Sequence, residues 1–215
     1  MTSSLLISRR RFVEGAAILG LATAVPGSAW AQAAPSNAAL MAEGALPDIW
    51  IGSPDAPVTV IEYASMTCPH CATFHHETYP ALKAQYIDTG KVRFSLREFP
   101  FDPLATAGFM LGRCAGPDKR NAMLELLFAQ QKNWAYSDKP LQGLSNLVKQ
   151  TGMSQETFES CLKDQKLYDQ VNAVRDAGAK LGVESTPTFF INGKKASGGM
   201  SITEMSKLFA PFLKS

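Results

Sequence analysis

The apolar positions of this chain fall into short β-branched runs and longer helical stretches. Residues 57–64 form a β-branched run that predicts a buried strand. Residues 92–97 alternate apolar and polar side chains, which predicts a second strand. Between the two, a helix is expected from Pro69 to about Tyr86, with a kink at Pro80. The predicted order is therefore strand, helix, strand.

A long helical stretch and a second group of strands follow. Residues 101–182 have helical patterns and are expected to form an insertion rather than a separate domain, because strand patterns resume after them. Residues 188–191 predict a strand, Asn192–Gly193 a type I′ hairpin turn, and residues 194–197 the returning strand. A capping box at Ser201 begins a last amphipathic helix. These elements together predict an α/β fold.

The first 31 residues have the pattern of a cleaved export signal. Arg9–Arg11 precede an apolar run at residues 16–25, and an A-x-A sequence ends at Ala31. A membrane anchor is the weaker alternative, because such a run spans about 15–18 Å as a helix, against the ~30 Å hydrocarbon core. Ser8–Val13 resembles the twin-arginine export pattern, although three arginines also suit the general secretory route. We expect export to a bacterial periplasm, cleavage near Ala31, and a flexible leader over residues 32–50.

Composition and charge exclude several classes of protein. The chain is 46% hydrophobic and 19% charged, a mix that can bury a core, so disorder, collagen-like repeats and an integral membrane protein are excluded. The net charge of +2 comes from the first 31 residues, since residues 32–215 hold 18 basic and 18 acidic side chains. Charge therefore gives no reason to expect nucleic acid as a partner.

Four cysteines lie in the part expected to be exported. Cys68 and Cys71 form a C-P-H-C motif and are close enough to pair, which leaves Cys114 and Cys161 for a second, structural disulfide. A thiol at a helix start meets unpaired N–H groups and the positive end of the dipole, and His70 adds a donor or a positive charge. These groups favour the thiolate of Cys68, and a stabilised thiolate makes the disulfide a strong oxidant.

Other interpretations of the cysteines compete with this one. A purely structural disulfide is one alternative for the C-x-x-C, but it would close so short a loop that it constrains little of the unfolded chain. A zinc site would use Cys68, Cys71 and one of His70, His75 or His76, yet no second C-x-x-C or H-x₃-H partner exists. We expect no metal and no cofactor, and we expect the last two histidines on the helix surface. A second redox pair that relays electrons to Cys71 is the alternative for the other two cysteines.

Two further positions are candidates for the site. Glu62 interrupts an apolar strand, where a carboxylate is costly unless it has a partner or a function. It either exchanges a proton with Cys71 or pairs with a basic group such as Arg93 or Arg97. Thr186–Pro187 begins the strand expected beside the first one, so a cis peptide that faces the cysteines is the sharper interpretation.

These motifs together resemble the DsbA family of bacterial thiol:disulfide oxidoreductases. The resemblance rests on the strand with Glu62, on the C-P-H-C motif, on the T-P-T-F sequence from Thr186, and on the helical insertion between them. It implies a thioredoxin fold with an inserted helical domain. Residues 51–100 and 183–215 would form the thioredoxin-like domain, and residues 101–182 the insertion.

The resemblance also implies roles for the site residues. Cys68 would be the exposed attacking sulfur and Cys71 its buried partner, with a cis Pro187 beside them. The second cysteine pair is absent from the best-known members, and threonine at position 186 is shared with the disulfide isomerases.

The expected function is that of a monomeric periplasmic dithiol oxidase. It would donate the Cys68–Cys71 disulfide to unfolded or folding exported proteins with free thiols, and a quinone-linked membrane protein like DsbB would reoxidise it. An isomerase or reductase is the second hypothesis. The periplasmic isomerases of this fold dimerise through an added N-terminal domain, and residues 32–50 are too few to build one. A non-catalytic binding module of thioredoxin fold is the third.

Overall fold

The computed structural model describes residues 37–213. The expected signal peptide, its cleavage site and the twin-arginine pattern lie outside the described residues. The elements in chain order are α1 (Asn37–Met41), β1 (Val58–Ala64), α2 (Pro69–Glu77), α3 (Tyr79–Leu82), the π-helical turn η1 (Lys83–Ile87), β2 (Val92–Glu98), α4 (Pro103–Cys114), α5 (Pro117–Ala129), α6 (Gln131–Trp134), α7 (Pro140–Lys149), α8 (Gln155–Lys163), α9 (Gln165–Lys180), β3 (Thr188–Ile191), β4 (Lys194–Ser197), α10 (Ile202–Phe209) and the 3-10 turn η2 (Ala210–Phe212). Within the described part of the chain, no helix is both long and apolar enough to cross a bilayer.

The four strands form one mixed sheet in the order β2-β1-β3-β4. β1 runs parallel to β2 and antiparallel to β3, and β3 and β4 form a hairpin. Asn192 and Gly193 in its turn have φ values of 44° and 85°, as a type I′ turn requires. The expected helix after β1 is broken at Thr78, because Pro80 lies in the first turn of α3, where its missing N–H is tolerated.

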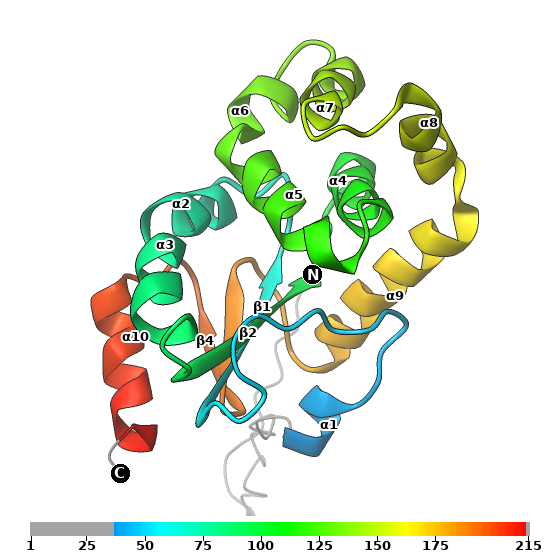
Figure 1. Ribbon diagram of the computed structural model, residues 1–215. Coiled ribbons are helices and arrows are strands. Elements are labelled where there is room, and N and C mark those ends of the chain that lie inside the picture. Colours follow the sequence, from blue (N-terminus) through cyan, green and yellow to red (C-terminus); the bar gives the residue numbers. More distant parts are fainter. Residues whose placement is uncertain (1–36, 214–215) are drawn as a thin grey trace, which may run out of the picture. The chain divides into compact units, whose positions relative to one another are not determined.

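Helices cover both faces of the sheet (Figure 1). α2, α3 and α10 lie on one side, and α9 lies on the other. Alternate residues of β1 point to the two faces, as the two-residue period of a strand demands. Val58 and Val60 belong to the larger core with α2 and α10, whereas Ile61 and Tyr63 belong to the smaller core on the side of α9.

The segment between β2 and β3 contains the helices α4 to α9 and no strand, and it extends beyond the end of the sheet (Figure 1). Its last helix, α9, packs against β1 at Gly178, where an added Cβ would lie 2.6 Å from the Tyr63 ring. Only glycine permits so close an approach. The mixed four-stranded sheet with helices on both faces, and the helical segment between β2 and β3, confirm the expected thioredoxin fold with a helical insertion.

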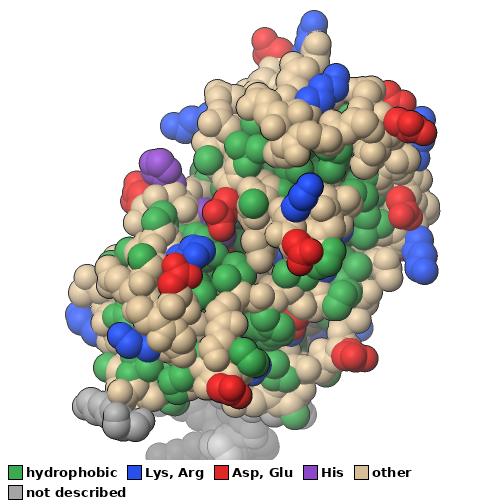
Figure 2. Space-filling model, in the orientation of Figure 1, with side chains coloured by type: hydrophobic (Ala, Val, Ile, Leu, Met, Phe, Trp, Pro, Cys, Tyr) green, Lys and Arg blue, Asp and Glu red, His purple; other side chains and the backbone are tan. Residues whose placement is uncertain are grey.

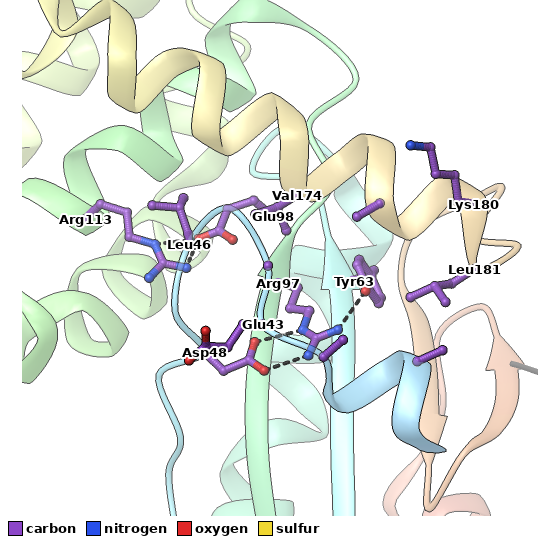
Figure 3. A pocket seen from close by; sticks show the side chains of 14 residues that line it. Glu43, Leu46, Asp48, Tyr63, Arg97, Glu98, Arg113, Val174, Lys180 and Leu181 are labelled. Carbon is purple, nitrogen blue, oxygen red and sulfur yellow. Dashed lines mark hydrogen bonds and ion pairs between the residues drawn. The ribbon is translucent and has the colours of Figure 1, made fainter. Parts of the chain in front are cut away.

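The expectation of a flexible leader does not describe residues 37–50, because they pack against the sheet. Leu40 is buried in the smaller core. Arg97 donates to both carboxylate oxygens of Asp48, at 2.8 and 2.6 Å, and to the Leu40 carbonyl at 2.7 Å. Figure 3 shows Arg97 and Asp48 beside a pocket of about 180 Å³, with the Tyr63 hydroxyl accepting a fourth bond from Arg97.

A buried charge cluster joins the insertion to β2. Glu98 is fully buried, and one of its oxygens lies 2.7 Å from a guanidinium nitrogen of Arg120 and 2.7 Å from one of Arg113. Both arginines come from the insertion, at α5 and α4. These two cations hold the pKa of Glu98 below its ordinary value, although its burial acts in the opposite direction.

Candidate active site

The C-P-H-C motif occupies the start of α2, directly after the turn that follows β1. Cys68 is the N-cap residue and has an extended backbone, and Pro69 takes the first helical position. Cys68 exposes 8% of its surface and Cys71 exposes none. Cys68 is thus the accessible thiol of the two, as expected, but its exposure is slight. Both cysteines are thiols in this structure.

The start of the helix stabilises the thiolate of Cys68. Hydrogen bonding from Cys71 is the largest cause and lowers the pKa of Cys68 to about 5, although burial of the sulfur opposes this shift. Thr186 and the backbone N–H groups of His70 and Cys71 act in the same direction. The imidazole of His70 lies exposed, so in this structure its residue acts on Cys68 through the backbone.

The second thiol has the opposite character. Burial raises the pKa of Cys71 well above its ordinary value, and hydrogen bonding to Cys68 and the negative charge of Glu62 add to that rise. At neutral pH the pair is therefore one thiolate and one thiol. This arrangement suits Cys68 to act chemically as a nucleophile and leaving group, while Cys71 holds the proton.

The loop before β3 completes the site from a distant part of the chain. The Thr186–Pro187 peptide is cis. In its protonated form the Cys68 thiol donates to the Thr186 carbonyl oxygen over 3.3 Å. The two segments are 118 residues apart in sequence.

Glu62 lies on the same face of β1 as Val58 and Val60, and its partner is neither of the arginines considered above. Its Oε2 lies 2.9 Å from Nε2 of His75. Arg93 instead donates to the Thr59 hydroxyl and Arg97 to Asp48, so under the alternative of a pair with a basic group, neither of the two arginines named is that group. The expectation that His75 lies on the helix surface is also wrong, because its side chain is 5% exposed. His76 is exposed, as expected.

The insertion supplies site residues that the sequence analysis missed. Gln131 is buried at the start of α6, and its side-chain N–H groups donate to the carbonyls of Met66 and Cys68 at 2.8 and 3.0 Å. The Tyr136 hydroxyl donates to the Thr67 carbonyl at 2.6 Å. No local pattern marks either residue, because their partners lie more than 60 residues away in sequence.

Cys114 and Cys161 form a disulfide, as the spacing argument expected. It joins the end of α4 to α8 within the insertion. Among residues 37–213, no group of three or more His, Cys, Asp and Glu side chains is placed to hold a metal ion. Figure 2 shows acidic and basic side chains interspersed over the visible face, rather than gathered by sign.

Comparisons with known proteins agree with this geometry. Residues 45–210 match the thioredoxin family model. A Rickettsia conorii protein, classed by its name with the protein-disulfide oxidoreductases, is 36% identical over 164 residues. The match covers 74% of this chain and 58% of that protein, so the chain spans less than two thirds of this relative's length.

Solved structures extend the likeness over nearly their whole length. The crystal structure of Wolbachia pipientis alpha-DsbA1 has a TM-score of 0.74 and 30% identity, covering 80% of this chain and 94% of that one. Oxidised BdbD from Bacillus subtilis has a TM-score of 0.70 and 26% identity, covering 78% and 94%. From the family model and these structures together, the chain belongs to the thioredoxin family as a DsbA-like protein.

Proposed function

We propose that this protein is a dithiol oxidase that transfers the Cys68–Cys71 disulfide to exported proteins with free thiols. The observation that carries the proposal is the asymmetry of the two thiols, with the pKa of Cys68 lowered to about 5 and that of Cys71 raised. A stabilised thiolate in the reduced form makes the disulfide form a strong oxidant, because reduction then releases free energy.

The transfer takes two exchange steps. A client thiolate attacks the Cys68 sulfur, the Cys68–Cys71 bond breaks, and Cys71 leaves with the electron pair and takes up a proton. The client's second thiolate then attacks the client sulfur of the mixed disulfide, and Cys68 leaves as the stabilised thiolate. The client loses two electrons and gains a disulfide, while the protein ends with one thiolate and one thiol.

The remaining site residues have supporting roles in this proposal. Glu62 exchanges the proton with Cys71, which is consistent with its effect on the pKa of that thiol. The cis Thr186–Pro187 peptide lies beside Cys68 and orients an extended client segment. Cys114–Cys161 is structural.

The proposal includes the cellular setting. Residues 1–31 would direct export to the periplasm and be removed, the mature chain would act as a monomer, and a DsbB-like membrane protein linked to quinone would reoxidise Cys68 and Cys71. The N-terminal arginines, the apolar run and the A-x-A sequence support export.

A glutathione redox titration combined with oxidation of a reduced, unfolded protein tests the function. An oxidase should have a potential near that of DsbA, about −120 mV, whereas a structural disulfide lies below about −300 mV. Cys68→Ala is the control and should abolish oxidation. A second assay on a scrambled client separates the isomerase, which would restore native pairing faster than it oxidises thiols. If the potential is low and neither assay detects thiol exchange, the non-catalytic binding module is the hypothesis that remains.

A further inference from the structure

One face of α2 lies directly over Glu62. Cys71 and His75 are four residues apart on this helix and therefore lie on the same side. Between them, the ring of Phe74 packs 4.8 Å from that of Phe189, which is paired with Glu62 across the sheet. The His75 ring thus reaches the carboxylate one helical turn beyond Cys71.

Glu62 and His75 form a buried pair with unused hydrogen-bonding capacity. The side chains are 0% and 5% exposed. Glu62 Oε1 and His75 Nδ1 have no hydrogen-bond partner among residues 37–213. A buried carboxylate is costly unless its environment serves a function. An arginine would have neutralised Glu62 permanently, whereas an imidazole takes up and releases protons near neutral pH.

His75 also lines a surface pocket of about 360 Å³ together with Tyr79 and Glu125, and Cys71 is not among the residues that line it. Its ring stacks on Phe128 at 4.3 Å, which fixes the orientation of the imidazole. Lys83 and Asp88 in this pocket pair with each other at 2.6 Å. The titratable and charged groups around His75 come from five elements and one residue after them: Glu62 on β1, Cys71 on α2, Tyr79 on α3, Lys83 on η1, Asp88 directly after η1, and Glu125 on α5.

We propose that His75 is a proton-relay residue that carries the Cys71 proton between Glu62 and water in the pocket beside Tyr79. The proposal rests on the thiol-exchange function above. When reduced protein is reoxidised, the oxidant first forms a mixed disulfide with Cys68. Cys71 then gives its proton to Glu62, attacks the Cys68 sulfur, and the oxidant's thiolate leaves with the electron pair.

The proton on Glu62 must then reach solvent. The His75 imidazole accepts it at Nε2. Nδ1 is buried in the resting structure, so it releases its proton when a fluctuation of the pocket lining lets water reach it. When the protein acts as an oxidant, the same groups deliver a proton to Cys71 as its thiolate leaves. The relay therefore speeds both directions equally and leaves the equilibrium unchanged.

His75→Gln and His76→Gln are the matched pair of variants. Gln at position 75 can still donate to Glu62 but cannot carry a proton, while position 76 is exposed and does not contact Glu62. Reduced protein is mixed with oxidised glutathione, quenched with acid, and the mixed disulfide at Cys68 is followed by mass spectrometry from about pH 5 to pH 9.

We expect His75→Gln to slow resolution of the mixed disulfide by about 100-fold, the lower end of the range for a positioned proton-transfer group. The equilibrium constant with glutathione and the titration of Cys68 should stay within about twofold of the unchanged protein, as should every property of His76→Gln. In His75→Ala, added imidazole should restore the rate, which a purely structural role would not allow.

If His75→Gln resolves the mixed disulfide at Cys68 as fast as the unchanged protein does at every pH, the relay is wrong. A slower rate accompanied by an equal shift in the equilibrium constant and no rescue by imidazole would also overturn it. If the unchanged protein oxidises thiols but His75→Gln matches it, the relay alone fails. If the unchanged protein forms no mixed disulfide, the proposed function fails, and the relay with it.

Discussion

Removing the Cys114–Cys161 crosslink should destabilise the protein without changing the chemistry of the C-P-H-C motif. The bond closes a loop with a sequence separation of 47. In the chain-entropy model, opening such a loop gives the unfolded chain about 13.6 cal/mol/K, or about 4 kcal/mol at 25 °C. That figure is an upper value, because residual structure in the unfolded chain reduces it.

The assay compares Cys114→Ala/Cys161→Ala with the unchanged protein by thermal unfolding and by glutathione titration. For a domain of this size about 1 kcal/mol corresponds to 2–4 °C, so Tm should fall by up to about 8–16 °C. The potential of Cys68–Cys71 should stay within about 30 mV, the equivalent of ~1.4 kcal/mol. Cys114→Ala alone should lose most of the same stability, which separates the crosslink from the packing of the buried Cys161 side chain.

A large change in potential with an unchanged Tm would refute this reasoning. The second pair would then exchange electrons with Cys71, and its position between α4 and α8 would have to be part of the redox chemistry. An unchanged Tm with an unchanged potential would refute the loop-entropy magnitude alone.

Four further predictions concern single side chains. Cys68 should react with iodoacetamide with an apparent pKa of about 5. Because folding lowers this pKa, the Cys68 thiolate should stabilise the reduced protein fully above pH 9.0, the ordinary pKa of the thiol, and this stabilisation should be lost as the pH falls through 5. Identical melting temperatures at pH 4 and pH 9 would contradict this. Cys71→Ala should accumulate mixed disulfides with clients on non-reducing gels, and their absence would argue against transfer through Cys68. His70→Ala keeps the backbone N–H through which His70 stabilises the Cys68 thiolate, so the potential in glutathione titration should stay within about 30 mV; a clearly less oxidising disulfide would show that the imidazole contributes as well. Glu98→Gln should cost about 3–5 kcal/mol in urea unfolding, because it leaves the buried Arg120 cation without its carboxylate; a loss below about 1 kcal/mol would show that the cluster relaxes.

Local sequence signals predicted the elements that carry the site. The β-branched run gave β1 to within one residue, and the Asn192–Gly193 turn and the Ser201 capping box both form. These signals work because strand period, positive φ and capping depend on a few neighbouring residues. Cys68 and Cys71 were found in the same way, from a motif at a helix start.

The partners of buried polar groups could not be predicted in this way. Glu62 was recognised as an anomaly in an apolar strand, yet its partner His75 lies on a helix whose rotation depends on the packing of Phe74 against the sheet. Gln131 and the docking of Asp48 on Arg97 likewise depend on contacts made across the folded chain. Residue type shows that a partner is needed, and tertiary packing decides which one is available.

The bonds from Gln131 to the Met66 and Cys68 carbonyls join α6 and the turn at residues 65–68 into one cooperative unit. In native-state fluctuations, amide exchange in that turn should follow the opening free energy of α6 rather than that of the sheet. Substitutions in α6 can therefore alter how long Cys68 and its neighbours stay ordered. Sequence changes in the insertion can therefore alter how long the residues around Cys68 keep this arrangement, without any change in the C-P-H-C motif.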